Sequence, residues 1–318
     1  MREQPSRRAV LGLLGGAAVG SVAGCLGGES VSVLAAGSLA VPMEDGVGPE
    51  FESAGGATFQ GEYHGSNAVV RMIRDRQASP DVAISADVGL LRDRLYDEHA
   101  TWDVVFGSNE VGLAYNPETD LGQRLDGGEP WYEVLRAADD GEVAISDPNL
   151  DPLGYRAVHL LALAERTYEI EDLRETVLDR AYREPAEPQL LAGVETGDRS
   201  VAVSYRNMAL DRDLPFYDLP PELNFSDPAY ADLYASVSYT TDDGHAVRGS
   251  PTLYSATVLE SADSPEAGRS FVEFLLDSPG LLREAGLAVP DSLPHSHGRV
   301  PEELGVEHGA RSEPEGSS

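Results

Sequence analysis

Apolar and polar positions along the chain predict short strands, each followed by a helix. A strand is expected where an apolar run of four to six residues is bounded by turn residues, and a helix where apolar residues recur at intervals of three and four. The interval is clearest at 67–76, where Val69, Val70 and Ile73 fall on one helical face. The predicted strands are 31–34, 58–63, 80–85, 102–106, 111–115, 142–146, 200–205, 216–220 and 251–259, and the main predicted helices are 40–53, 67–76, 88–96, 131–138, 155–168, 266–276 and 280–285.

This alternation is typical of an α/β fold in which helices cover both faces of a mostly parallel sheet. The 318 residues suffice for two domains, each with its own core. We predict one lobe from 31–115 together with 245–291, and a second lobe from 116–244, with the first crossover near Asn116. Residues 292–318 are polar and rich in Pro, Gly and His. They are expected to form a disordered tail.

The first 25 residues have the pattern of an export signal. Ser6-Arg7-Arg8 is a twin-arginine motif, an apolar run follows from Leu11 to Ala23, and Val22-Ala23-Gly24-Cys25 resembles a lipoprotein processing site. A transmembrane helix is the alternative, but the run is shorter than the roughly 20 residues that a span needs. We therefore predict 1–25 as a signal, lipidation at Cys25, and a short tether at 26–30. Since Cys25 is the only cysteine, no intramolecular disulfide is possible.

The chain is strongly acidic, with 55 Asp and Glu against 23 basic residues and a net charge of −32, and it contains no lysine. This charge disfavours nucleic acid and anionic lipid headgroups as partners. A carboxylate-rich surface also stays hydrated in very salty surroundings, so we expect a halophilic protein. At about 1 M salt the Debye length is roughly 3 Å, so an anionic ligand would feel only its own pocket.

Two turns combine a strand end, a glycine and a serine at the start of a helix. They are Ala35-Ala36-Gly37-Ser38-Leu39 and Gly65-Ser66-Asn67. Such turns direct backbone N–H groups and a hydroxyl at one spot, which suits an anion. Ser85 also lies at a strand end, although a cap or turn role is favoured for it. The two turns predict a binding site for a small oxyanion, unless Ser38 and Ser66 only cap their helices.

Six segments, in order, resemble the periplasmic-type solute-binding proteins for molybdate and tungstate, especially the archaeal branch. They are AGSLAVP (36–42), GSNAVVRMI (65–73), DVAISAD (81–87), FGSNEVGLAY (106–115), SDPNLDPLGYR (146–156) and SYRNMA (204–209). The resemblance runs from about 31 to 290. It implies a two-lobed periplasmic-binding-protein fold of type II, with mixed sheets, flanking helices and a ligand cleft between the lobes.

The resemblance also implies a function. The protein would be a lipid-anchored, monomeric solute-binding component on the outer face of the cell membrane that captures molybdate or tungstate. It would deliver the anion to an ABC permease with its ATPase, and it would use no cofactor and hold no metal other than that of the anion. The site residues implied are Ser38, Ser66 and Tyr205, with backbone donors near Leu153 and Val194. An ordinary half-buried aromatic is the alternative for Tyr205.

Asp151 is the remaining candidate. In the archaeal branch a carboxylate in this Asp-Pro motif, and a glutamate just before the tyrosine of the later strand, add two oxygens to the metal. Asp151 matches the first residue, but Ser204 stands at the second position, so the coordination number stays open. Asp151 followed by Pro152 is equally typical of a helix N-cap.

Other readings of the residues remain open. The same fold could bind sulfate or thiosulfate; phosphate is disfavoured because a protonated anion needs an acceptor, for which only Asp151 is a candidate. A hydrolase is disfavoured because the chain has no G-x-S-x-G motif. A surface-layer or adhesive lipoprotein would show repeats and β-rich patterning, and neither is present. Arg156 and Arg206 are expected to form structural ion pairs.

Overall fold

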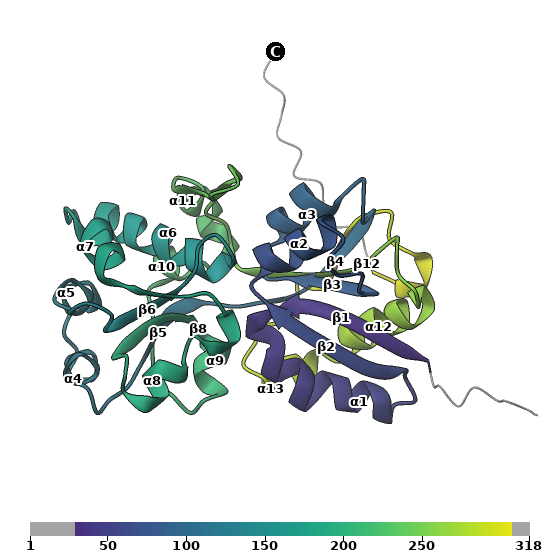
Figure 1. Cartoon of the computed structure of the whole chain (residues 1–318), viewed down its shortest axis with the longest axis horizontal. Coiled ribbons are helices and arrows are strands. Elements are labelled where there is room, and N and C mark those ends of the chain that lie inside the picture. The colour runs from purple at the N-terminus through teal and green to yellow at the C-terminus, as the bar shows by residue number, and fades with distance from the viewer. Residues whose placement is uncertain (1–28, 307–318) are drawn as a thin grey trace, which may run out of the picture.

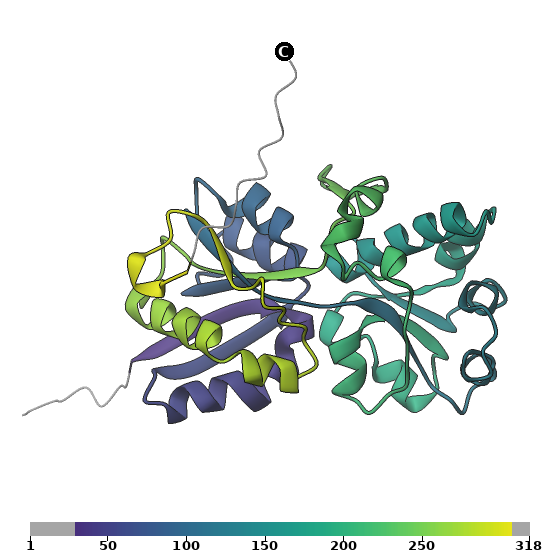
Figure 2. The same ribbon diagram turned by 180° about the vertical axis from the view of Figure 1, so that it is seen from behind.

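The chain forms two α/β lobes that lie side by side and are joined by two connecting segments (Figures 1 and 2). The computed structural model describes residues 29–306. In that range no helix combines the length and the apolar character needed to cross a membrane. The predicted fold class, mixed sheets flanked by helices in two lobes, is confirmed.

Lobe 1 is built on a six-stranded sheet with the strand order β13-β4-β12-β3-β1-β2. Strand β1 pairs in parallel with β2 and β3, whereas β12 pairs antiparallel with β3 and β4. Its elements are β1 (Ser30–Ala36), η1 (Gly37–Leu39), η2 (Pro42–Val47), α1 (Gly48–Ser53), β2 (Thr58–His64), α2 (Ser66–Arg74), β3 (Val82–Ser85), α3 (Val88–Leu95), β4 (Trp102–Ser108), β12 (Leu253–Val258), α12 (Pro265–Asp277), α13 (Pro279–Glu284), β13 (His295–Gly298) and η5 (Glu302–Leu304).

Lobe 2 is built on a five-stranded sheet with the order β7-β6-β8-β5-β9, and a separate hairpin, β10-β11, lies beside it. Its elements are β5 (Val111–Tyr115), α4 (Asp120–Asp126), α5 (Trp131–Arg136), β6 (Val143–Ser146), α6 (Pro152–Thr167), α7 (Leu173–Arg180), β7 (Tyr182–Glu184), η3 (Glu187–Gln189), α8 (Ala192–Thr196), β8 (Val201–Tyr205), α9 (Arg206–Leu210), β9 (Phe216–Tyr217), α10 (Pro221–Asn224), η4 (Pro228–Tyr230), α11 (Ala231–Tyr234), β10 (Ser238–Thr240) and β11 (Ala246–Arg248).

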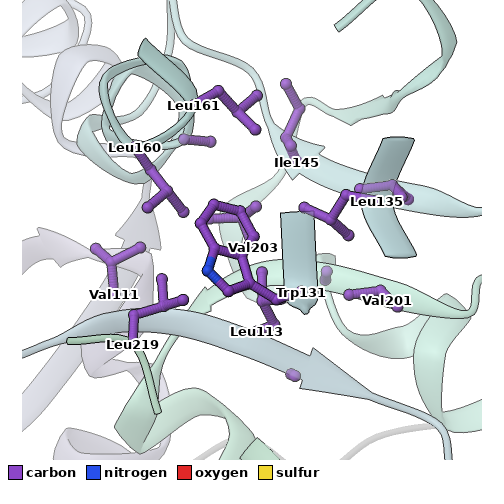
Figure 3. Packing of buried hydrophobic residues seen from close by; sticks show 14 of the residues in the cluster. Val111, Leu113, Trp131, Leu135, Ile145, Leu160, Leu161, Val201, Val203 and Leu219 are labelled. Atoms are coloured by element: carbon purple, nitrogen blue, oxygen red, sulfur yellow. The ribbon is translucent and has the colours of Figure 1, made fainter. Parts of the chain in front are cut away.

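Each lobe closes its own apolar core. In lobe 1 one cluster lies under α1, α12 and α13 and another under α2 and α3, on opposite faces of the sheet. In lobe 2 the indole of Trp131 lies among side chains from β5, β6, β8 and α6 (Figure 3). Helix α6 is the central helix of this lobe, and 13 of its 16 residues are buried. It therefore offers a rigid base for polar side chains at its N-terminal end.

Both predicted boundaries between the lobes are wrong by one strand, since β11, which the predicted return at 245 puts in lobe 1, pairs with β10 of lobe 2. Strand β5 was assigned to lobe 1, but it pairs antiparallel with β8 and β9 in the lobe 2 sheet. The chain therefore crosses over at Asn109 and Glu110 rather than near Asn116. The apolar residues of a strand indicate that it is buried, but they do not indicate which strands it pairs with. The sequence of β5 is therefore compatible with either sheet.

The prediction of a disordered tail is wrong for the part of it that the structure describes. Strand β13 pairs antiparallel with β4, and Leu304 of η5 is buried in the lobe 1 core. Main-chain hydrogen bonds hold β13, so its polar side chains gave no apolar pattern to detect. Residues 307–318, the signal at 1–25 and Cys25 lie outside the described range.

If 299–304 is part of the lobe 1 core, Leu304→Ala should lower the free energy of unfolding by about 2 kcal/mol, because it leaves a cavity beside α12. Urea unfolding at high salt measures this. The matched control is Glu303→Ala, which removes an exposed partner of Arg269 and should change stability by less than about 1 kcal/mol. Equal stability of the two variants would contradict the docked C-terminal segment.

Candidate ligand-binding site

Polar side chains from both lobes converge where β1, α2, α6 and β8 meet, and most of them are buried. The predicted residues Ser38, Ser66, Asp151 and Tyr205 are each no more than 2% exposed. Backbone groups of the two lobes touch here as well, since Ala68 N–H donates to the Leu150 carbonyl at 3.1 Å. We call this arrangement, with the lobes in contact and the candidate site between them, the closed form.

Neither predicted serine caps a helix through its side chain. The N-cap positions are Ala36 for η1 and Gly65 for α2, with no capping side chain at either. The Ser66 hydroxyl oxygen accepts a hydrogen bond from Ala86 N–H at 3.0 Å. Because this bond uses the oxygen as acceptor, the proton of Ser66 is left to donate to another group.

The Ser38 hydroxyl lies at the end of a chain of hydrogen bonds. Asn109 Nδ2 donates to the Tyr254 hydroxyl at 3.1 Å, and Tyr254 is 2.9 Å from Ser38 Oγ. Since Tyr254 already accepts from Asn109, the arrangement that satisfies all three groups has Tyr254 donating to Ser38. Asn207 Nδ2, from lobe 2, donates to the Ser38 carbonyl at 2.7 Å and holds this turn in place.

Tyr205 ends β8 and is completely buried. Its hydroxyl oxygen accepts from Arg156 Nη1 at 2.7 Å, and burial raises the pKa of Tyr205 well above its ordinary value. The phenol thus keeps its proton as a donor. Ser204, its neighbour in the strand, donates to the Tyr205 carbonyl at 3.0 Å and supplies no group to the cluster.

Asp151 performs the capping role that was its alternative. Its Oδ1 accepts from Leu153 N–H at 2.7 Å, at the start of α6, and its Oδ2 accepts from Ser146 Oγ at 2.5 Å. The carboxylate is nevertheless 1% exposed and lies against Gly65, where an added Cβ would be 2.8 Å from Asp151 Cβ. It is both a cap and a member of the buried cluster.

Two predicted backbone donors have other partners. Leu153 N–H binds Asp151, as described, and Val194 N–H donates to the Leu191 carbonyl at 3.0 Å within the turn that begins α8. The N–H groups of these two residues are therefore occupied, and the prediction of backbone donors near them stays a prediction. Ser85 forms a turn in which its hydroxyl accepts from Asp87 N–H and donates to the Asp87 carbonyl, as favoured for it.

Sequence analysis missed Glu187, the first residue of η3. Its Oε2 accepts from Gly37 N–H of lobe 1 at 2.8 Å, while its buried Oε1 has no hydrogen-bond partner among the described residues. Glutamate precedes proline at both Glu184 and Glu187, and the second position carries no pattern that marks it as buried. The cluster therefore has two carboxylates, although the glutamate predicted to complete the pair is replaced by Ser204.

The two carboxylates influence each other. Burial raises the pKa of Asp151 to about 6, against the hydrogen bonds from Ser146 and Leu153 that lower it. Burial also raises the pKa of Glu187 well above its ordinary value, and the charge of Asp151 raises it further. Two desolvated carboxylates therefore lie among hydroxyl donors, and ionising both at once costs free energy.

The other buried charges form a network across the lobes. Asp87, at the start of α3 in lobe 1, accepts from Tyr155 Oη at 2.6 Å and from Arg156 Nη2 at 3.3 Å, both from α6 in lobe 2. Arg156 thus forms the structural ion pair expected for it. Arg206 does so too, with Glu110 at 2.9 Å and with Asp218, at the edge of the site.

Comparison with known proteins identifies the family of the chain. The family model described as bacterial extracellular solute-binding protein matches residues 31–286. A solute-binding protein of Halobacterium salinarum is 49% identical over 301 residues, which cover 94% of this chain and 97% of the relative. The molybdate/tungstate-binding protein WtpA of Pyrococcus abyssi is 30% identical over 326 residues, which cover 89% of this chain and 93% of the relative.

Solved structures show the same architecture. The periplasmic molybdate-binding protein of Azotobacter vinelandii matches with a TM-score of 0.60 at 15% identity, covering 83% of this chain and 100% of that chain. At this level of identity the likeness concerns the fold.

The raised pKa of Asp151 predicts how stability depends on pH. Between about pH 4 and pH 6 the folded state holds more protons at Asp151 than the unfolded state, so the stability of the ligand-free protein falls as pH rises through this window. Asp151→Asn keeps a capping oxygen and removes the charge. It should leave stability nearly unchanged at pH 3, below both pKa values, and raise it by roughly 1–3 kcal/mol at pH 8, measured by urea unfolding.

The control is Asp120→Asn, which changes an exposed carboxylate on α4. It should alter stability by less than about 0.5 kcal/mol at either pH. Destabilisation by Asp151→Asn at pH 8 would contradict the charge penalty assigned to Asp151.

Proposed function

The chain belongs to the family of bacterial extracellular solute-binding proteins, and on that premise we propose that it captures molybdate or tungstate between its two lobes and delivers the anion to an ABC permease. As a member of this family it is an extracellular solute-binding protein of an ABC transporter, and no catalytic family is indicated. The proposal concerns the identity of the solute and the residues that hold it.

The hydroxyl donors favour a fully deprotonated oxyanion. Ser66 and Tyr205 each have the oxygen occupied by a donor, Ala86 N–H and Arg156 Nη1 respectively, which leaves their protons for the ligand. Tyr254 likewise occupies the Ser38 oxygen, and the Ser38 hydroxyl faces the Glu187 carboxylate, whose pKa it lowers. A dianion such as molybdate, tungstate or sulfate accepts hydrogen bonds at every oxygen, so preorganised neutral donors suit it. Hydrogen phosphate would need an acceptor for its own proton.

The choice of a metal oxyanion over sulfate rests on the two buried carboxylates. Asp151 and Glu187 are both buried in the cluster, and the Oε1 atom of Glu187 has no hydrogen-bond partner among residues 29–306. Molybdenum and tungsten can expand from four to six oxygens, and two carboxylates would supply the added pair. Sulfur in sulfate does not expand in this way, so ionised carboxylates would only repel it.

Calorimetric titration of the purified protein with molybdate, tungstate, sulfate and phosphate, in a high-chloride buffer, tests the proposal. We expect the first two to bind at least about 100-fold more tightly than sulfate, a difference of about 2.7 kcal/mol. Sulfate binding as tightly as molybdate would replace the proposed solute by another oxyanion. Absence of binding by all of them would refute the oxyanion site.

Serine variants locate the site within the same measurement. Ser38→Ala and Ser66→Ala should each weaken molybdate binding by about 1–3 kcal/mol, because each leaves an anion oxygen without its donor. The matched control is Ser204→Ala, whose hydroxyl donates to the Tyr205 carbonyl instead. Wild-type affinity in both Ser38→Ala and Ser66→Ala would contradict the site.

We also propose that the mature protein is attached to the membrane by lipid at Cys25 after twin-arginine export. The support is the order of the motifs in the first 25 residues: the arginine pair, the apolar run and the small residues before Cys25. An anchored binding protein stays near its permease, which raises the local concentration at which the two meet.

Replacing Cys25 removes the attachment point. In the native host, Cys25→Ser should move the protein from the membrane fraction to the medium, as measured by immunoblotting of both. Arg7→Ala with Arg8→Ala should instead keep it inside the cell, because the export signal is lost. Retention of the Cys25→Ser protein on the membrane would contradict a lipid anchor.

A further inference from the structure

We propose that Asp87 is a positioning residue through which closure of the lobes fixes Tyr205 as a donor to the ligand. The proposal rests on the proposed function in so far as the ligand is an oxyanion. It concerns a carboxylate that belongs to lobe 1, does not lie among the predicted ligand-binding residues, and reaches the site only by way of α6 in lobe 2.

Arg156 determines what Tyr205 can do. A guanidinium only donates hydrogen bonds, so the contact of 2.7 Å from Arg156 Nη1 makes the Tyr205 oxygen an acceptor. The single phenolic proton is then directed away from Arg156. Both side chains are at most 1% exposed, so water does not compete for either group. Tyr205 is therefore set as a donor as long as Arg156 keeps its position.

Asp87 fixes that position from the opposite lobe. Its Oδ2 accepts from Arg156 Nη2 and from the Tyr155 hydroxyl, and its Oδ1 accepts from Leu90 N–H at 3.0 Å as the cap of α3. Among the described residues, Asp87 is the carboxylate that forms an ion pair with Arg156. When the lobes separate, Arg156 loses this partner, so the counter-charge and acceptor that fix its guanidinium are absent.

The remaining titratable groups around Arg156 do not replace Asp87. Tyr155 and Tyr205 keep their protons, because burial raises the pKa of each well above its ordinary value. His159, one turn further along α6, stays neutral, because burial and the charge of Arg156 lower its pKa to about 4. Asp151 interacts with Arg156 through its charge, but it is bonded to Ser146 and Leu153.

The chain contains a second cluster of the same three residue types, which separates the effect of closure from that of burial. Asp103 is fully buried and accepts from Arg92 Nε at 2.8 Å, from Arg92 Nη2 at 3.0 Å and from the Tyr96 hydroxyl. All three residues belong to lobe 1. This cluster stabilises one lobe, whereas the cluster of Asp87, Tyr155 and Arg156 forms only between two lobes.

The test uses Asp87→Asn, which keeps an Oδ1 atom as the cap of α3 and replaces the acceptor Oδ2 by a donor. Asparagine is as good a cap as aspartate, so α3 should stay folded. The matched control is Asp103→Asn, which removes a buried carboxylate from the same kind of cluster without touching the interface between the lobes.

The first readout is the separation of the lobes in the ligand-free protein. Spin labels are placed in a Cys25→Ser background at Asp75→Cys in lobe 1 and Glu175→Cys in lobe 2, both exposed positions. Pulsed electron resonance should show that Asp87→Asn shifts the distance distribution away from the closed form, while Asp103→Asn keeps the wild-type distribution. An unchanged distribution in Asp87→Asn overturns the coupling, whichever anion the protein binds.

The second readout is the dissociation rate of molybdate, followed by intrinsic fluorescence in a stopped-flow instrument. Asp87→Asn should raise this rate at least tenfold and leave the association rate within about threefold, and Asp103→Asn should leave both unchanged. In a Tyr205→Phe background, Asp87→Asn should raise the dissociation rate of molybdate by less than a further threefold, because the hydroxyl that Asp87 positions is gone.

The outcomes separate the two proposals. A full tenfold effect of Asp87→Asn in the Tyr205→Phe background overturns the positioning role, and so does an equal effect of Asp103→Asn. If the wild-type protein binds none of the anions, the proposed function fails, and the distances between the labels still decide whether Asp87 couples the lobes.

Discussion

Burial of charge between two lobes is the constraint on which the site depends. Arg156, Asp87, Asp151 and Glu187 are all almost inaccessible to water, and they come from three separate segments of the chain. A charge that loses its hydration needs a partner or a proton, and Arg156, Asp87 and Glu187 each have a partner on the facing lobe. The hydroxyls of Ser38, Ser66 and Tyr205 become directed donors because neighbouring groups already occupy their oxygens. The same contacts therefore orient the hydroxyl donors, join the two lobes and, on the proposed function, determine how tightly the ligand is held.

Much of this could be predicted from the sequence, because the signals were local. The turns at Ser38 and Ser66 follow strands and begin helices, and the Asp-Pro pair at 151 and 152 marks the start of α6. Glu187 could not be found in this way. It lies in a segment with two Glu-Pro pairs, and only the packing of η3 against Gly37 of the other lobe buries it. Ser204 stands where the resemblance places a glutamate, and the second buried carboxylate, Glu187, comes from a different segment.

The errors in the fold have a related cause. Strand β5 was assigned to the wrong lobe because an apolar pattern reports burial and not the identity of the neighbouring strand. Strand β13 was missed because main-chain pairing with β4 needs no apolar side chains. The net charge of the chain describes its surface and does not predict which groups lie in the cleft between the lobes. In that cleft an arginine donates hydrogen bonds to two partners. Arg156 binds Tyr205 through one amino group and Asp87 through the other, and a lysine ammonium could not hold both in a fixed plane.

The position of β12 has a consequence for the order in which the chain folds. Strand β12 lies between β3 and β4 in the lobe 1 sheet, but it follows the whole of lobe 2 in the sequence. Lobe 2 is one continuous segment, so all of it is synthesised before β12, which completes the middle of the lobe 1 sheet. Lobe 1 can close only when a loop of more than a hundred residues brings β12 beside β4, and a loop that has already folded into a compact unit lowers the entropy cost of that closure. Lobe 2, which is inserted in the sequence between β4 and β12, thus helps lobe 1 to close once lobe 2 has folded.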